Sequence, residues 1–135
     1  MILDTAGRAW IGTPFIAGQS VRGIGCDCVG FVAGVWRDAF GDLPEAIGPY
    51  AQDEPGRREA ETLLDPLRRH LQEIDLENRA RGDVLAWRWR GGRFAQHLAI
   101  ASADGMIHAD QRFGVVETPL FPTHRLAGVF RPWPL

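Results

Sequence analysis

The sequence has 135 residues, 45% of them hydrophobic, and a formal net charge of −2. A chain of this length is typical of one compact domain with its own apolar core, so we predict a single domain over residues 1–135. Near-neutral charge argues against a nucleic-acid-binding protein, and because all 15 basic residues are arginine, chemistry that depends on lysine is excluded.

The first 15 residues lack the basic start, the apolar run of about 7–15 residues and the cleavage site of a secretory signal peptide. No stretch approaches the roughly 18 consecutive apolar residues that a membrane span needs. We therefore expect a protein that is made in the cytoplasm, does not insert into a membrane, and reaches any other place with a partner.

Helical patterns dominate the N-terminal half. A short helix is predicted over residues 3–11, and the glycine-rich residues 17–26 are predicted to form a loop. Apolar residues recur at steps of three and four over residues 27–40, which predicts a longer helix that Gly41 closes. Two of its residues, Gly30 and Gly34, lie on one face; because each costs about 1 kcal/mol relative to alanine, we expect another backbone segment close to that face.

The middle of the chain combines a connection and a second helical pattern. Residues 42–56 contain three prolines, which favour an extended surface segment. Helical spacing returns over residues 57–74. Asp65 is a candidate N-cap that would split this segment in two, since Asp65 precedes a proline.

Short strands follow in the C-terminal half. Five are predicted, over residues 84–89, 97–103, 105–109, 114–118 and 127–131. Helices followed by strands predict an α+β domain with an antiparallel sheet.

The only two cysteines, Cys26 and Cys28, are too close together to link distant segments by a disulfide, and a disulfide between them would close a small strained ring. Cys28 falls at the predicted helix start, with Asp27 or Gly25 in the cap region. Free backbone N–H groups and the helix dipole favour a thiolate there. Cys28 is therefore the better nucleophile, and a buried structural cysteine is the alternative interpretation.

Two histidines lie in neighbouring predicted strands. His97 opens one strand and His108 lies in the next, and the intervening Ala103-Asp104-Gly105 is typical of a hairpin turn. Both imidazoles are thus expected at one end of the sheet. A cysteine peptidase needs a thiolate, an imidazole that moves the proton and a group that orients the imidazole, and Cys28, His97 and His108 form such a set.

Other interpretations of these residues are weaker. Two cysteines and two histidines are also a zinc ligand set, but the Cys-x-Cys gap is shorter than the usual knuckle spacing. His70 is expected on an exposed arginine-rich helix face, and His124 in a late loop, neither with a catalytic role.

Six short motifs occur in a recognisable order: Trp10-Ile11-Gly12-Thr13-Pro14-Phe15, Asp27-Cys28-Val29-Gly30-Phe31-Val32, Leu43-Pro44, Gly82-Asp83-Val84, His97-Leu98-Ala99-Ile100 and Ile107-His108-Ala109. In this ordered set, which spans most of the chain, the sequence resembles the NlpC/P60 superfamily of cell-wall cysteine peptidases.

The resemblance implies a papain-like α+β fold in which a helix bearing the cysteine at its N-terminus packs on an antiparallel sheet bearing the histidines. It implies Cys28 as nucleophile, His97 as general base and His108 as the residue that orients His97, with no metal or organic cofactor. The implied substrate is a peptidoglycan stem peptide, cut at an amide bond that is often D-glutamyl–diaminopimelate.

Within the superfamily, the Gly25-Cys26-Asp27-Cys28 motif and the arginine-rich composition look most like the peptidases of phage tails and gene transfer agents. That branch implies tail or hub proteins as partners and action on the cell wall of a recipient cell.

Two departures from the family and several substrate-binding residues complete the prediction. Phe15 stands where the family usually has tyrosine, and Val29 where many relatives have serine. Loss of the tyrosine hydroxyl removes a donor near the cysteine, so an inactive structural tail component is an alternative function, as is an amidase or acyltransferase with the same cysteine and histidines. The predicted substrate-binding residues are Phe15, Asp27, Arg22 and Arg88.

Overall fold

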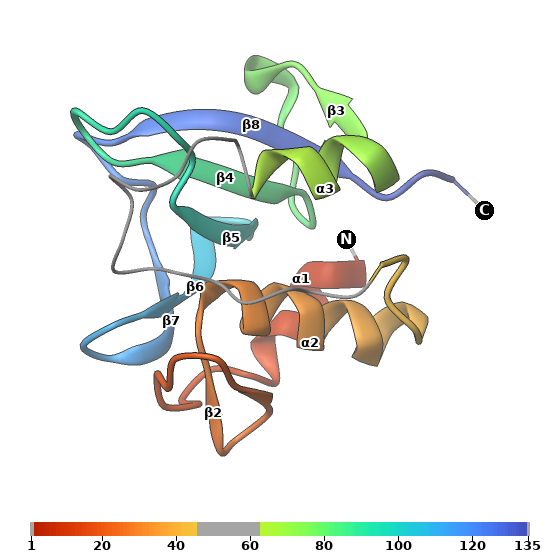
Figure 1. Ribbon diagram of the computed structural model, residues 1–135, viewed down its shortest axis with the longest axis vertical. Helices are drawn as coiled ribbons and strands as arrows, with labels where there is room; N and C mark the ends of the chain where they lie inside the picture. Colours follow the sequence, from red (N-terminus) through yellow and green to blue (C-terminus); the bar gives the residue numbers. More distant parts are fainter. Residues whose placement is uncertain (1, 46–62, 135) are drawn as a thin grey trace.

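The computed structural model describes residues 2–45 and 63–134, in which the α-helices precede the strands of the main sheet along the chain (Figure 1). The helices are α1 (Ile2–Arg8), α2 (Cys28–Phe40) and α3 (Leu64–His70), and a 3-10 turn covers Leu76–Asn78. Two short strands, β1 (Ser20–Val21) and β2 (Gly25–Cys26), pair with each other.

Within the described residues, six strands form one antiparallel sheet in the order β3-β8-β4-β5-β6-β7. They are β3 (Gln72–Ile74), β4 (Val84–Arg88), β5 (His97–Ala101), β6 (Met106–Asp110), β7 (Gly114–Thr118) and β8 (Arg125–Arg131). The predicted α+β class with an antiparallel sheet is confirmed.

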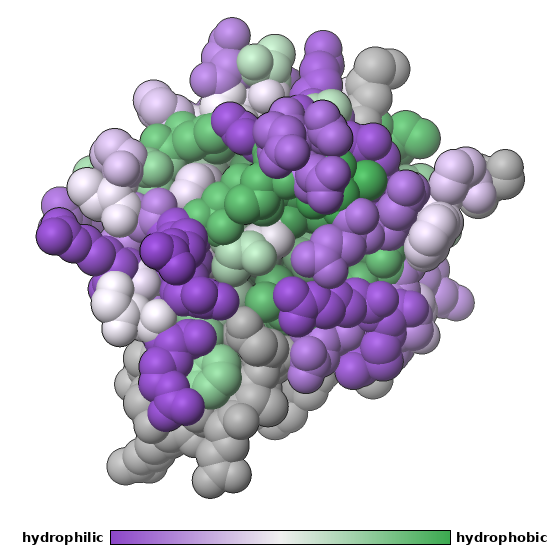
Figure 2. Space-filling model, turned by 90° about the horizontal axis from the view of Figure 1, so that it is seen from above, coloured by the Kyte–Doolittle hydropathy of each residue, from purple (hydrophilic) through white to green (hydrophobic). Residues whose placement is uncertain are grey.

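The sheet buries apolar side chains on both faces. Helices α1 and α2 lie side by side against β5 and β6, whereas α3 lies beside β3 and β8 (Figure 1). Along β4, Val84 and Ala86 pack into the cluster that includes Phe31 of α2, whereas Leu85 and Trp87 belong to a second cluster, as strand alternation requires. Seen from above, hydrophilic side chains border a strip of apolar ones (Figure 2).

Helix α2 begins and ends as the sequence predicts. Asp27 is the N-cap, and its Oδ1 accepts the backbone N–H of Gly30 at 2.7 Å. Its Oδ2 accepts the N–H of Gly18 at 2.7 Å, which ties the preceding loop to the start of the helix. Gly41 closes the helix with φ of 91°, a conformation that glycine adopts without strain.

The two glycines inside α2 allow close packing. A Cβ at Gly30 would overlap the carbonyl oxygen of Gln19, so the predicted close approach of another backbone is confirmed there. At Gly34 a Cβ would overlap the ring of Trp10, so the neighbour is a side chain rather than a backbone. Both contacts hold α2 against the segment that follows α1.

Residues 71–74, predicted as helix, form the C-cap of α3, at Leu71, and strand β3 instead. Gln72, Glu73 and Ile74 pair with Arg131, Phe130 and Val129 of β8. Sheet pairing with a distant segment overrides the local helical spacing here, because propensity is weak compared with tertiary contacts. The proposed cap is also wrong: α3 begins at Leu64, so that Asp65 lies inside its first turn.

Residues 17–26, predicted as a loop, contain the β1–β2 pair. The predicted strands agree with β4 to β8 to within two residues, and the β5–β6 turn is closed by a bond from the Ser102 N–H to the Gly105 carbonyl. Most of the predicted connection over 42–56 and the first part of the predicted helix over 57–74 lie outside the described residues. In the described ranges, no helix has the length and apolarity of a membrane span.

Candidate active site

The two histidines predicted to meet are in hydrogen-bond contact. Nε2 of His97 lies 2.9 Å from Nδ1 of His108, with the ring planes at 89°. Nε2 of His108 lies 3.0 Å from Oγ1 of Thr118, on the neighbouring strand β7. His97 is 7% exposed and His108 is 2% exposed, so both imidazoles are withdrawn from water.

Burial keeps both imidazoles neutral. Desolvation, reinforced by His108 and His124 and opposed by Asp110, lowers the pKa of His97 to about 3. Desolvation also lowers the pKa of His108, again opposed by Asp110. Because a neutral imidazole has one nitrogen without a proton, the pair contains a base at neutral pH.

Aromatic rings surround the histidine pair. Trp89 stacks on His97 with centroids 5.2 Å apart, and Phe121 lies 5.8 Å from His97 and 5.3 Å from His108. His124 contacts Trp89 at 4.4 Å, but its Nδ1 accepts the backbone N–H of Arg90 at 2.9 Å. His124 thus lies among these rings with Nδ1 engaged by backbone rather than by the pair.

Helix α2 begins at the end of the sheet that carries the histidines. The N–H of Cys26 donates to the Pro14 carbonyl at 3.0 Å, and the carbonyl of the preceding Thr13 accepts the N–H of Val115 at 2.9 Å. Val115 pairs with Ala109, the neighbour of His108. The same end of β6 lies opposite the start of β5, where His97 is, because the two strands are antiparallel. Figure 1 shows α2 starting beside β6.

The two cysteines differ in position. Neither forms a disulfide, and both are buried. Cys26 belongs to the apolar core cluster, where burial, the Asp27 carboxylate and Cys28 raise its pKa to about 12, so it remains a thiol. Cys28 is the first residue of α2, at the positive end of the helix dipole.

No group of three or more His, Cys, Asp or Glu side chains in the described ranges is placed to hold a metal ion. The alternative zinc site made of both cysteines and two histidines is therefore not assembled in this structure.

Phe15 and Asp27, two predicted substrate-binding residues, lie next to the start of α2. Phe15 forms an isolated bridge with Cys26 and packs against the core cluster. Asp27 is 3% exposed, and both its carboxylate oxygens accept backbone N–H groups. In the structure Asp27 thus acts as the N-cap of α2; its contact with a substrate stays a prediction.

The two arginines predicted to bind substrate lie in different parts of the structure. Arg22 Nη1 lies 3.2 Å from Oδ2 of Asp38, which is ten residues, or about 15 Å, along α2 from Cys28. Arg88 is the last residue of β4 and is partly buried. Contact between either guanidinium and a substrate stays a prediction.

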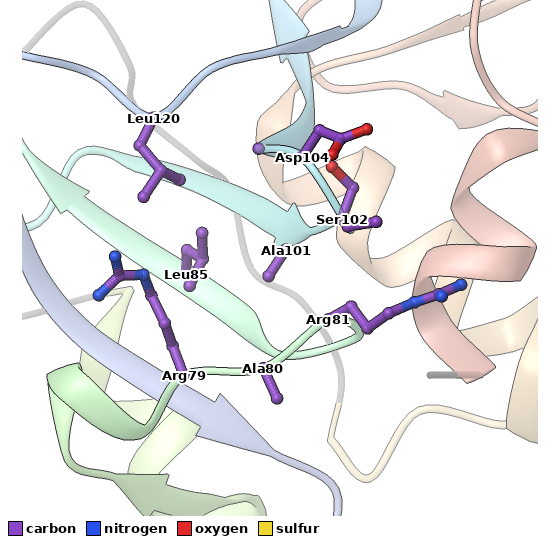
Figure 3. A pocket seen from close by; sticks show the side chains of 10 residues that line it. Arg79, Ala80, Arg81, Leu85, Ala101, Ser102, Asp104 and Leu120 are labelled. Atoms are coloured by element: carbon purple, nitrogen blue, oxygen red, sulfur yellow. The ribbon is translucent and has the colours of Figure 1, made fainter.

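Figure 3 shows a hollow of about 470 Å³. Leu85, Ala101 and Leu120 line it, and all three belong to or pack on the second apolar cluster. Arg81 extends from its rim toward α1, where its Nε lies 2.9 Å from Oδ2 of the buried Asp4. None of the three predicted catalytic residues lines this hollow.

Comparison with solved structures identifies the class of fold. The α+β arrangement is that of NlpC/P60 domains. The NlpC/p60 domain of the peptidoglycan hydrolase SagA is 26% identical with a TM-score of 0.61, over 87% of this chain and 86% of that chain. An NlpC/P60 family protein from Bacillus cereus is 25% identical with a TM-score of 0.67, over 98% of this chain but only 40% of that chain.

A third structure with this fold is RipD from Mycobacterium tuberculosis, a non-catalytic NlpC/p60 domain protein adapted to binding peptidoglycan. It is 14% identical with a TM-score of 0.58, over 96% of this chain and 94% of that chain. No protein-family model matches the sequence, and a comparison with curated proteins finds no match. The structural neighbours show the NlpC/P60 fold and support the resemblance to the superfamily.

Sequence reasoning missed Thr118, Trp89 and Phe121 at this site. Thr118 had a usable signal: in the β6–β7 hairpin His108 pairs with Val116, so Thr118 is the diagonal neighbour on the same face. Trp89 and Phe121 come from segments flanking the strands, and their contact with His97 depends on loop paths that periodicity does not reveal.

Proposed function

We propose that this chain is a cysteine peptidase that hydrolyses amide bonds in peptidoglycan stem peptides. The observation that carries the proposal is the buried, neutral His97–His108 pair at the sheet end where the cysteine-bearing helix begins. Similarity of fold to the peptidoglycan hydrolase SagA supports peptidoglycan as the substrate.

In the proposed reaction Cys28 is the nucleophile, His97 the general base and His108 the residue that orients His97. His97 takes the thiol proton, and the thiolate attacks the carbonyl carbon of the amide. The C–N bond breaks, the leaving amine takes the proton from His97, and a thioester remains on Cys28. Water gives a proton to His97 and attacks the thioester carbon, the C–S bond breaks, and the released sulfur of Cys28 takes the proton back from His97. Backbone N–H groups at the start of α2, that of Cys28 among them, stabilise the oxyanion.

Muropeptide analysis tests this proposal and identifies the amide bond that is cleaved. Peptidoglycan with diaminopimelate in its stem peptides is incubated with the protein, and the masses of the soluble products are measured by mass spectrometry. We expect stem peptides cut between D-glutamate and diaminopimelate. Intact stems released from the glycan would identify an amidase instead. Binding to sacculi without any product would favour the inactive structural component, a role with a precedent in the fold of RipD.

We further propose that the protein is carried on a phage-like tail or gene transfer agent particle, with tail or hub proteins as partners, to the wall of a recipient cell. The Gly25-Cys26-Asp27-Cys28 motif and the exclusive use of arginine over lysine support this branch. If the proposal is correct, an antibody against the chain detects it in particles purified by density gradient. Its absence from particles that retain their tails would contradict the proposal.

A further inference from the structure

The hydrogen-bonded series that begins at His97 continues past His108. Oγ1 of Thr118 lies 3.0 Å from Nε2 of His108 and 2.9 Å from the carbonyl oxygen of Pro119. The series therefore runs from His97 through His108 and Thr118 to a backbone carbonyl. That last group decides the direction of every bond, because a carbonyl can only accept.

The protons can be assigned from that end. The Thr118 hydroxyl has one proton, and it must donate this proton to the Pro119 carbonyl for that bond to form. Its oxygen can then only accept from His108, so His108 carries its proton on Nε2. In neutral His108 this leaves Nδ1 as an acceptor, and His97 must donate to it from its own Nε2. The remaining nitrogen of neutral His97, Nδ1, then has no proton.

We propose that Thr118 is a positioning residue that fixes both imidazoles as Nε2–H tautomers and thereby leaves Nδ1 of His97 as the base. The catalytic meaning of this arrangement rests on the proposed function, but the tautomers themselves are a property of the folded chain and can be measured without a substrate.

The surroundings favour this assignment over a carboxylate-oriented pair. Asp110 is the acidic group whose charge acts on both histidines, yet its Oδ1 accepts the backbone N–H groups of Arg112 and Phe113 at 2.8 and 2.9 Å. Phe121 covers both imidazoles with an aromatic ring, which is not a competitive acceptor. Thr118 is thus the neutral group that accepts from the second histidine.

Nitrogen NMR of the protein labelled with ¹⁵N-histidine tests the proposal directly, because imidazole ¹⁵N shifts and long-range couplings distinguish the two tautomers. In the wild type at neutral pH we expect His97 and His108 both as Nε2–H tautomers. In Thr118→Val the acceptor is lost, so we expect a tautomer mixture at His108 and an altered His97 signal, whereas Thr118→Ser keeps the hydroxyl and the wild-type pattern.

Activity gives the second readout. Thr118→Val is expected to lower kcat/KM at least about tenfold through kcat, with Thr118→Ser restoring most of it. Thr123→Val, at an exposed threonine nearby in the chain, is the matched control and should change neither readout.

An Nδ1–H tautomer at either histidine of the wild type, or unchanged tautomers in a folded Thr118→Val, would overturn the proposal. If Thr118→Val does not fold, the wild-type tautomers alone decide. A protein with the expected tautomers but no peptidoglycan cleavage would refute the proposed function and not this assignment.

Discussion

Cys28→Ala is expected to abolish peptidoglycan cleavage, a loss of at least about 10³-fold, whereas Cys26→Ala keeps most of it. The two thiols are two residues apart and both are buried, so the pair is matched for position and size. Of the two, only Cys28 occupies the helix N-terminus, whereas Cys26 lies in the apolar core, where burial raises its pKa to about 12. Muropeptide release per unit time, measured for both variants and the wild type, checks the expectation.

Iodoacetamide labelling provides a readout that needs no peptidoglycan. Because the thiolate is the species that reacts, Cys28 should label first near neutral pH and Cys26 should stay unmodified until the protein unfolds. Circular dichroism of both variants controls for folding. Equal cleavage by the wild type and a folded Cys28→Ala would refute the nucleophile assignment, and loss of activity only in Cys26→Ala would reverse it.

Local patterns in the sequence were sufficient for the elements that depend on local contacts. Asp27 and Gly41 cap α2 because cap preferences act over three or four residues, and β5 and β6 follow from short apolar runs on either side of a tight turn. Residues 72–74 could not be predicted in the same way. Their partner β8 lies more than 50 residues further along the chain, and the local spacing of apolar residues does not predict that pairing.

In the candidate site, too, features that depend on local contacts could be predicted and those that depend on distant segments could not. The contact between His97 and His108 follows from the hairpin that joins their strands. Their burial and lowered pKa values do not, since rings such as Trp89 and Phe121, which lie outside the strands, contribute to covering the pair. The position of Cys28 at the same sheet end depends on the backbone hydrogen bond from the Val115 N–H to the Thr13 carbonyl, a contact between residues 102 positions apart.

The placement of Cys28 also depends on how its helix is anchored, and we expect Phe31 to be the main anchor. Phe31 is fully buried three residues after Cys28, on the face of α2 turned to α1 and the sheet. Its ring meets Trp10 edge-on with centroids 6.1 Å apart, and its tip faces Gly7, where an added Cβ would lie 3.5 Å from it. Removing this ring would leave a cavity that neither neighbour can fill.

Phe31→Ala is therefore expected to lower the free energy of unfolding by about 3–5 kcal/mol, a large share of the roughly 5–15 kcal/mol typical of a domain. Urea unfolding followed by tryptophan fluorescence checks this, with a lower midpoint and an unchanged slope. Phe113→Ala removes the same atoms from a side chain that is 69% exposed, and it should change the unfolding free energy by less than about 0.5 kcal/mol. If both variants lost the same stability, or Phe31→Ala lost less than about 1 kcal/mol, α2 would be anchored mainly by the close contacts at Gly30 and Gly34 rather than by this ring.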